Sequence, residues 1–211
     1  MKTTSKDYRD YIIKDGIFIG AFEEMYQNIQ DPWFIGNANH FTYNVALELI
    51  NYYKICENGG YVLDVGCGKG SFTSRLKKQM SKSKIIGIDI SETAINKSKN
   101  KYKDIEFKCL NILNEYDKLS VKFNLIVMSQ IMWYILPQFD KIIKILWEKL
   151  NDDGYLLIMQ SFLKQEEQKY GKEIIKNIDD MLQIINHESI EMIELNRFKE
   201  HDSIILFKRW L

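Results

Sequence analysis

The sequence predicts an α/β fold in which a mainly parallel, seven-stranded sheet carries helices on both faces. From residue 61 onward, short apolar runs alternate with segments of helical spacing, the pattern of parallel strands joined by crossover helices. The first five runs contain little internal polarity, which is typical of strands buried on both faces. We expect the strands at Tyr61–Val65, Lys84–Asp89, Ile105–Leu110, Phe123–Ser129, Tyr155–Phe162, Ile190–Asn196 and Ser203–Lys208.

The segments between the expected strands show the spacing of amphipathic helices. Apolar residues three or four apart form stripes over 72–80 and 139–150. Ser91 is a suitable N-cap for a helix that follows the second strand. The run N-D-D-G at 151–154 predicts a turn before the fifth strand. The last two strands are separated only by about residues 197–202, too few for a crossover helix, so they should pair antiparallel.

The first 58 residues precede the sheet and predict a helical cover over the strand ends. Ile12–Ile29 and Phe41–Cys56 have helical patterns, and Pro32 breaks the chain between them because it disfavours helix at the preceding residue. The chain has no repeat, low-complexity tract or linker-like stretch. We therefore expect one domain over residues 1–211, with the cover at 1–58 and the sheet core at 59–211.

Composition narrows the partners and the compartment. Lys plus Arg and Asp plus Glu number 29 each, so the net charge gives no reason to expect a nucleic acid or a membrane surface as partner. Three cysteines without C-x-x-C spacing indicate neither a disulfide framework nor a zinc site. The charged N-terminus lacks the apolar run of a signal peptide, and no segment has the ~18 apolar residues that span a bilayer. We expect a cytoplasmic protein with no metal.

A glycine-rich loop, D-V-G-C-G-K-G, runs from Asp64 to Gly70 between the first strand and its helix. Its glycines allow backbone N–H groups to approach a ligand closely. A dinucleotide fold has G-x-G-x-x-G, whereas here the third glycine comes one residue early. Asp64 precedes the first glycine by two residues, and a carboxylate there repels a pyrophosphate but attracts an ammonium group.

A second acid, Asp89, ends the second strand in I-I-G-I-D-I-S. It lies 23 residues beyond Gly66, close to the separation at which a carboxylate meets ribose hydroxyls in such folds. A ligand with a ribose, a cationic amino-acid end and no phosphate suits both acids. S-adenosylmethionine is such a ligand.

Residues 60–160 resemble the core of class I S-adenosylmethionine-dependent methyltransferases. Asp64–Gly70 and Ile85–Ser91 match the first two motifs of that family, and Cys109–Ile112 and Phe123–Ile135 match the third and fourth strand segments. The resemblance implies a Rossmann-like sheet of order 3-2-1-4-5-7-6 with an antiparallel last strand. The chain departs from the family at Asn124, where Asp is common, and at 150–154, where the usual proline is missing.

The resemblance and the loop together give the expected site residues. Asn111 stands where the family usually has an Asp that contacts the adenine amino group. The residues expected to bind the cofactor are Trp33, Asp64, Gly66, Cys67, Gly68, Asp89, Ile90, Asn111, Ile112 and Ser129. The catalytic candidates are Gln130 and Tyr134, which follow the fourth strand, and His40, the best-placed base of the three histidines.

The expected activity is methyl transfer to oxygen or nitrogen of a small polar acceptor by a monomer or homodimer. The segments at 31–33, 129–134 and 168–171 resemble small bacterial enzymes near the nodulation N-methyltransferase group and enzymes of capsular and other surface-polysaccharide clusters. That extension implies a sugar or phosphoramidate acceptor. The alternatives are a nucleic-acid methyltransferase, which the neutral charge opposes, a non-catalytic scaffold, and more remotely a dehydrogenase.

Overall fold

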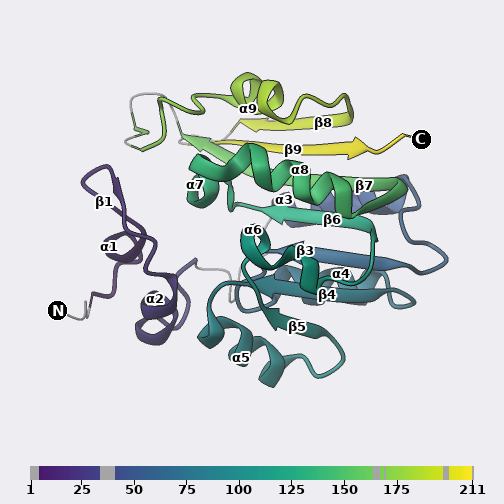
Figure 1. The fold of residues 1–211 in the computed structure, drawn as a ribbon, viewed down its shortest axis with the longest axis horizontal. Coiled ribbons are helices and arrows are strands. Elements are labelled where there is room, and N and C mark those ends of the chain that lie inside the picture. Colours follow the sequence, from purple (N-terminus) through teal and green to yellow (C-terminus); the bar gives the residue numbers. More distant parts are fainter. Residues whose placement is uncertain (1–4, 34–40, 164–166, 169, 197–199, 211) are drawn as a thin grey trace.

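The computed structural model describes residues 5–33, 41–163, 167–168, 170–196 and 200–210. Its centre is a seven-stranded sheet, and a two-stranded hairpin lies apart from it near the N-terminus (Figure 1). The hairpin strands are β1 (Ile13–Lys14) and β2 (Ile17–Phe18). The sheet strands are β3 (Tyr61–Val65), β4 (Lys84–Asp89), β5 (Glu106–Cys109), β6 (Phe123–Ser129), β7 (Leu150–Leu163), β8 (Ser189–Asn196) and β9 (Glu200–Lys208).

The sheet has the predicted topology. Its strands lie in the order β5-β4-β3-β6-β7-β9-β8, which is 3-2-1-4-5-7-6 when the seven are numbered along the chain. The first five are parallel, whereas β9 pairs antiparallel with both β7 and β8. Parallel neighbours need long crossovers, and the chain supplies a helix after each of β3 to β6. Only three residues separate β8 from β9, too few for the crossover helix that a parallel pair would need.

Helices cover both faces of the sheet, and each face has its own apolar cluster. One cluster includes side chains of α6, α7, α8 and α9, and the other includes side chains of α3, α4 and α5. The helices are α1 (Arg9–Ile12), α2 (Phe22–Asn28), α3 (Phe41–Tyr52), α4 (Ser71–Gln79), α5 (Glu92–Lys101), α6 (Ile112–Glu115), α7 (Met132–Ile135), α8 (Phe139–Lys149) and α9 (Ile178–Ile185). Two 3₁₀ turns, Tyr116–Lys118 and Leu136–Gln138, lead into β6 and α8.

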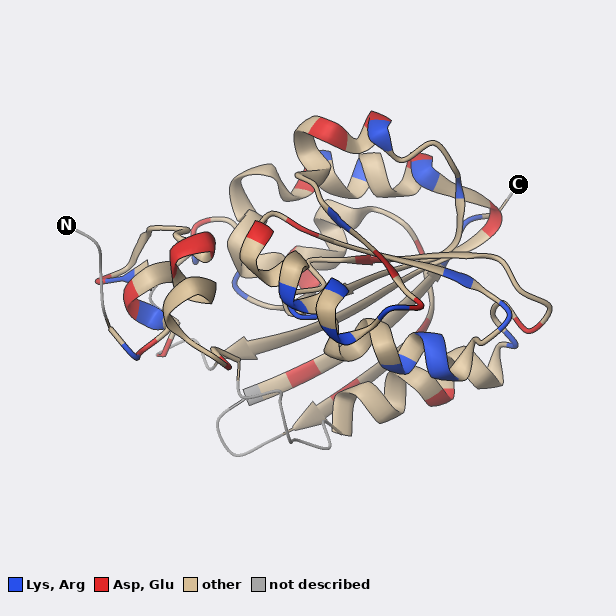
Figure 2. Ribbon diagram, turned by 90° about the horizontal axis from the view of Figure 1, so that it is seen from below, with Lys and Arg blue, Asp and Glu red and all other residues tan. Residues whose placement is uncertain are grey.

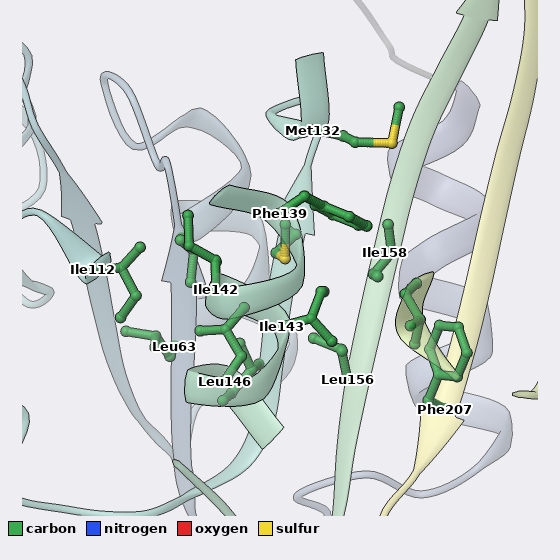
Figure 3. Close-up of a cluster of buried hydrophobic side chains, with 14 of the residues drawn as sticks. Leu63, Ile112, Met132, Phe139, Ile142, Ile143, Leu146, Leu156, Ile158 and Phe207 are labelled. Atoms are coloured by element: carbon green, nitrogen blue, oxygen red, sulfur yellow. The ribbon is translucent and has the colours of Figure 1, made fainter. Parts of the chain in front are cut away.

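Neighbouring residues of one strand serve opposite clusters, because side chains alternate across a strand. Val62 packs with the α3–α5 face and Leu63 with the α6–α9 face. Figure 3 shows the cluster on the α6–α9 face, in which Ile142, Ile143 and Leu146 of α8 lie over the side chains of the strands. This double burial is why the central strands are almost entirely apolar.

The N-terminal cover differs from the sequence prediction. A helix over Ile12–Ile29 is wrong for its first part, where the chain instead forms α1 and the β1–β2 hairpin. Asp15 and Gly16 connect the two strands with φ of +52° and +78°. Asp-Gly is the turn chemistry that a tight hairpin prefers, because both turn residues need positive φ. The helical pattern predicts the structure correctly only from Phe22, where α2 begins.

Other local predictions are confirmed or adjusted. Ser91 is the N-cap of α5, where its side chain accepts a hydrogen bond from Ala94 N. The helix expected at Phe41–Cys56 ends earlier, at Tyr52. The N-D-D-G turn appears as an irregular start of β7 with a register shift against β6. Asn124, where the family has Asp, accepts a hydrogen bond from Tyr61 N at 3.0 Å and so anchors the start of β3.

Charged side chains of both signs are spread along the described chain (Figure 2). Some helices carry one sign only, as α2 does with its glutamates and α4 with its basic residues, but both signs occur across the molecule in that view. Among the described residues, no helix combines the length and the apolar character that crossing a bilayer requires.

The core predicts a large stability difference between two substitutions on α8. Leu146 has no exposed surface, so Leu146→Ala should lower the free energy of unfolding by about 2–5 kcal/mol through lost burial and a residual cavity. Glu148→Ala, on the exposed side of the same helix, should change it by less than about 0.5 kcal/mol. Urea denaturation followed by circular dichroism measures both, and equal effects would contradict the packing described.

Candidate functional site

A cavity of about 1160 Å³ lies at the carboxyl ends of the parallel strands. This is the position at which open α/β sheets bind their ligands. The cover elements α1, the hairpin and α2 lie at the same end of the sheet (Figure 1). His40 lies outside the described residues. All other predicted site residues line the cavity: Trp33, Asp64, Gly66, Cys67, Gly68, Asp89, Ile90, Asn111, Ile112, Ser129, Gln130 and Tyr134.

The glycine loop connects β3 to α4 in a conformation that requires glycine. Gly66, Gly68 and Gly70 have φ of +72°, +53° and +75°. A Cβ atom at Gly66 would lie 2.5 Å from Ile131 Cγ2, and one at Gly68 would lie 2.7 Å from the Tyr26 hydroxyl. Both the backbone angle and the close neighbours therefore exclude larger residues. The loop backbone consequently forms one wall of the cavity.

Asp64 is buried at the base of this loop. Its Oδ2 accepts a hydrogen bond from Thr73 Oγ1 of α4 at 2.6 Å. Burial raises the pKa of Asp64 to about 7, and the Thr73 hydrogen bond only partly opposes this. The carboxyl group is thus balanced between its neutral and charged forms near neutral pH.

Asp89 holds the loop from the neighbouring strand. Its Oδ2 accepts from Gly68 N and its Oδ1 from Ser91 N, both at 2.9 Å. Burial raises the pKa of Asp89, although these backbone hydrogen bonds favour its charged form. The residue predicted to bind ribose therefore also has a structural task, which the sequence did not indicate.

The two carboxyl groups act on each other. The charge of Asp89 contributes to raising the pKa of Asp64. Two buried carboxylates close enough to repel are costly unless a cation or hydrogen-bond donors join them. A ligand with a positive charge would relieve both, so the electrostatics of this end of the cavity favour a cationic group.

Asn111 and Ile112 lie beyond the carboxyl end of β5. Asn111 is the N-cap of α6, and its Oδ1 accepts a hydrogen bond from Leu113 N at 3.0 Å. Its own N–H donates to Glu115 Oε2 at 2.9 Å. The amide oxygen predicted to meet adenine thus has one lone pair already in use.

Gln130 follows β6 in an uncommon backbone conformation, with φ of +57°. Its Oε1 accepts from Ser161 N at 2.9 Å and from Gln160 Nε2 at 3.4 Å. Gln160 Oε1 in turn accepts from Met132 N at 3.1 Å. Positive φ in a non-glycine residue costs of order 1–3 kcal/mol and persists where surrounding contacts impose it. These glutamines fix the turn after β6, which was not expected from the sequence.

Aromatic side chains of the cover close over the loop. Trp33 Nε1 donates to the Tyr26 hydroxyl at 2.8 Å, and this hydroxyl lies above Gly68. The rings of Trp33 and Tyr134 are 5.6 Å apart, and Phe22 meets Tyr134 edge to face at 5.3 Å. Burial raises the pKa of Tyr134, so its hydroxyl stays protonated at neutral pH.

Glu23 attaches α2 to the N-terminus of α5. Its carboxylate accepts from Ser91 Oγ at 2.6 Å, from Thr93 Oγ1 at 2.5 Å and from Thr93 N at 3.1 Å. Burial acts to raise the pKa of Glu23, but the hydrogen bonds from Ser91 and Thr93 outweigh it and lower the pKa to about 2. Negative charge at a helix N-terminus is favourable in addition. No local signal reveals this contact, because 68 residues separate its partners.

The described residues contain no group of three or more His, Cys, Asp or Glu side chains placed to hold a metal ion. Cys67 lies in the loop, where burial raises the pKa of its thiol and keeps it uncharged. The groups that the cavity offers for binding a ligand are therefore backbone amides, carboxylates and aromatic rings.

Comparison with known proteins gives a consistent family. A family model for methyltransferase domains matches residues 57–202. Carboxy-S-adenosyl-L-methionine synthase of Nautilia profundicola is 25% identical over 82% of this chain and 74% of that protein.

Two solved structures share the fold. NodS, an N-methyltransferase from Bradyrhizobium japonicum WM9 in complex with S-adenosyl-L-homocysteine, superposes with a TM-score of 0.66 and 17% identity, covering 85% of this chain and 92% of that one. An S-adenosylmethionine-dependent methyltransferase from Clostridium acetobutylicum has a TM-score of 0.66 and 14% identity, covering 86% and 96%. At these identities the likeness concerns the fold.

The raised pKa of Asp64 predicts how the affinity for S-adenosylmethionine depends on pH. Below about pH 7 the carboxyl group is protonated in the free protein, so binding a cationic amino-acid end must first expel a proton. Affinity should therefore rise up to tenfold per pH unit toward pH 7. Above about pH 8 the ligand's own α-amino group loses its proton, and affinity should fall. Calorimetry from pH 5.5 to 8.5 measures the profile.

The matched control for this profile is Asp64→Asn, which keeps the shape of the side chain but cannot titrate. This variant should bind S-adenosylmethionine more weakly at pH 7, and its affinity should not rise between pH 5.5 and 7. If the affinity of Asp64→Asn still rises with pH as in the wild type, the titrating group is not Asp64.

The Glu23 contact predicts a second, independent effect. Glu23→Gln removes the charge at the start of α5 and should cost about 1 kcal/mol of stability together with faster hydrogen exchange of the α2 amides. Because the folded pKa is depressed, the wild-type advantage should be full above pH 4.5 and disappear as the pH falls toward 2. Glu57→Gln, at an exposed position, is the control and should leave α2 exchange unchanged.

Proposed function

Because the chain belongs to the methyltransferase-domain family and is an S-adenosylmethionine-dependent methyltransferase, we propose that it methylates a nitrogen or oxygen of a small polar acceptor. The observation that carries the proposal is the pair of buried carboxyl groups, Asp64 and Asp89, on the two sides of the glycine loop. A cation-bearing nucleoside without phosphate suits this arrangement. The donor set fits the cofactor that the family uses.

The residues that would hold the cofactor follow from their places in the cavity. Asp64 and the loop amides would bind the amino-acid end. Asp89 would accept from the ribose hydroxyls through the lone pairs that Gly68 and Ser91 leave free. Asn111 and Ile112 would contact the adenine ring at the end of β5. Trp33, Ile90 and Ser129 line the same cavity and complete the predicted set.

The chemistry needs positioning more than proton transfer. The cofactor supplies a methyl group on a positively charged sulfur, which is already a strong electrophile. Holding the acceptor in line with it contributes about 7–11 kcal/mol in well-oriented reactions. Gln130 has no titratable group and Tyr134 remains protonated, so we assign both to shaping the acceptor side of the cavity.

The acceptor is proposed to be a small molecule because the cover narrows the approach to the strand ends. Cover side chains from Tyr8 to Trp33 line the same cavity as the loop. The balanced charge of the chain opposes nucleic acid and membrane surfaces as partners. A cytoplasmic monomer or homodimer, and a place among enzymes of capsular polysaccharides, stay predictions from the sequence.

Calorimetry with S-adenosylhomocysteine tests the proposal directly. We expect micromolar binding to the wild-type chain and at least tenfold weaker binding to Asp89→Ala, which loses the predicted ribose contacts. Asp117→Ala, at an exposed position outside the cavity, should bind like wild type. Because Asp89 also anchors the loop, thermal unfolding of each variant is recorded in parallel.

Two results would oppose the proposal. No binding of the nucleoside at millimolar concentration would contradict the function itself. Binding without transfer of a labelled methyl group to any acceptor in a cell extract would favour a scaffold role instead.

A further inference from the structure

The cavity is divided by the order of the strands. The glycine loop, Asp89 and Asn111 follow β3, β4 and β5, which lie on one side of the sheet centre. The remaining wall consists of residues that follow β6 and β7, of Asp202 near the start of β9, of Glu167, Gln168 and Tyr170, and of the β1–β2 hairpin. If the cofactor occupies the β3–β5 side as proposed above, the acceptor must enter the β6–β9 side. The character of that side therefore indicates the acceptor class.

The β6–β9 side is walled by aromatic rings from three parts of the chain. Phe18 of the hairpin stacks on Tyr170 with ring centroids 5.7 Å apart and planes 21° apart. Trp133, after β6, is fixed by its Nε1, which donates to Ser161 O at 2.9 Å. A Cβ atom at Gly171 would lie 2.1 Å from Leu136 Cδ1 and 3.9 Å from Trp133 Cε3, so Gly171 lies directly against the turn after β6. Such faces attract cations as well as apolar groups.

This wall contains a buried hydrogen-bond acceptor for which the described part of the chain supplies no donor. Gln168 is 3% exposed, and its Nε2 donates to Tyr170 O at 3.2 Å and to Ile175 O at 3.0 Å. These two bonds fix which end of the amide is nitrogen. The opposite atom, Oε1, is buried, has no hydrogen-bond partner among the residues that the structure describes, and belongs to a residue that lines the cavity. Unsatisfied buried acceptors are uncommon, and a ligand N–H or O–H would satisfy this one.

The charged residues that line the cavity distinguish an anionic acceptor from a cationic or neutral one. The described lining residues include two cations, and both have carboxylate partners: Arg9 pairs with Asp7 at 2.9 Å and Lys69 with Asp31 at 3.7 Å. The carboxylates of the lining are Asp15, Asp31, Asp64, Asp89, Glu167 and Asp202. A phosphate or carboxylate on the acceptor would find no uncommitted cation among these residues, and a cationic or neutral group is favoured.

We propose that the acceptor is an amine, whose N–H group donates to Gln168 Oε1 and whose body lies against Phe18, Tyr170 and Trp133. The inference rests on the proposed function. In the transfer, the bound ammonium first loses a proton to solvent. The lone pair of the neutral amine then forms the N–C bond, the C–S bond breaks, and its electrons return to sulfur. The positive charge thus moves from sulfur to nitrogen, and the proton of the resulting ammonium leaves to solvent. No base is required for bond formation, in keeping with the side chains of Gln130 and Tyr134.

Three matched probes test the class of acceptor. They are 2-phenylethylamine, 2-phenylethanol and 2-phenylethyl phosphate, each titrated calorimetrically into the chain loaded with S-adenosylhomocysteine. The amine should bind at least tenfold more tightly than the alcohol, and the phosphate should not bind. Equal or tighter binding of the alcohol or the phosphate would overturn the inference. Failure of S-adenosylhomocysteine itself to bind would instead contradict the proposed function, so the two failures are distinguishable.

A pair of variants at the exposed end of β7 tests the charge argument without touching the core. Leu163 is 38% exposed and lines the cavity. Leu163→Lys should weaken amine binding at least tenfold relative to Leu163→Gln, a neutral side chain of similar reach, while the affinity for S-adenosylhomocysteine stays the same in both. Identical amine affinities in the two variants would contradict an amine subsite on this side.

Gln168→Met tests the hydrogen bond. It should lower amine affinity at least fivefold with S-adenosylhomocysteine binding unchanged. Since Gln168 Nε2 also holds the backbone at Tyr170 and Ile175, thermal unfolding is measured on the same sample. If that variant does not fold, the Leu163 pair decides the question. A folded Gln168→Met with wild-type amine affinity would overturn the assignment of Gln168.

Discussion

Two buried carboxyl groups beside one glycine loop are the constraint on which this molecule is built. Asp89 is buried, and its carboxyl group accepts hydrogen bonds from the backbone N–H groups of Gly68 and Ser91. The Gly68 N–H can reach it because glycine at positions 66 and 68 allows the loop to turn back on the strand ends. The buried sheet supplies the rigid strand ends, and the cover shields the carboxyl groups from water. Loop, sheet and cover are therefore parts of a single electrostatic arrangement.

The cover takes part in that arrangement rather than merely lying over it. Tyr26 places its hydroxyl above Gly68. Glu23 binds Ser91 and Thr93 at the start of α5, a helix that begins three residues after Asp89. One surface helix thus contacts both the loop and the helix that follows the second acid. Displacing α2 would expose the carboxyl pair to water and weaken its hold on a cation.

The sequence predicted what depends on short-range pattern. The strands, the cap at Ser91 and the lining residues of the loop follow from periodicity and motif, since buried parallel strands and glycine turns leave strong local signals. The strand order follows from the resemblance to class I methyltransferases. The hairpin at 13–18 was not predicted, because the apolar spacing on both sides of its Asp-Gly turn is also typical of a helix. Glu23 and Gln168 could not be found, since their meaning comes from partners or cavities formed by distant parts of the chain.

The excess of carboxylates in the cavity wall bears on how many methyl groups one acceptor would receive. Methylation of an amine conserves positive charge, because the charge that sulfur loses appears on nitrogen. Carboxylates and aromatic faces hold a methylated ammonium as readily as its precursor. Electrostatics in this cavity therefore do not distinguish the first transfer from the second. The number of methyl groups is instead limited by the space around the acceptor nitrogen.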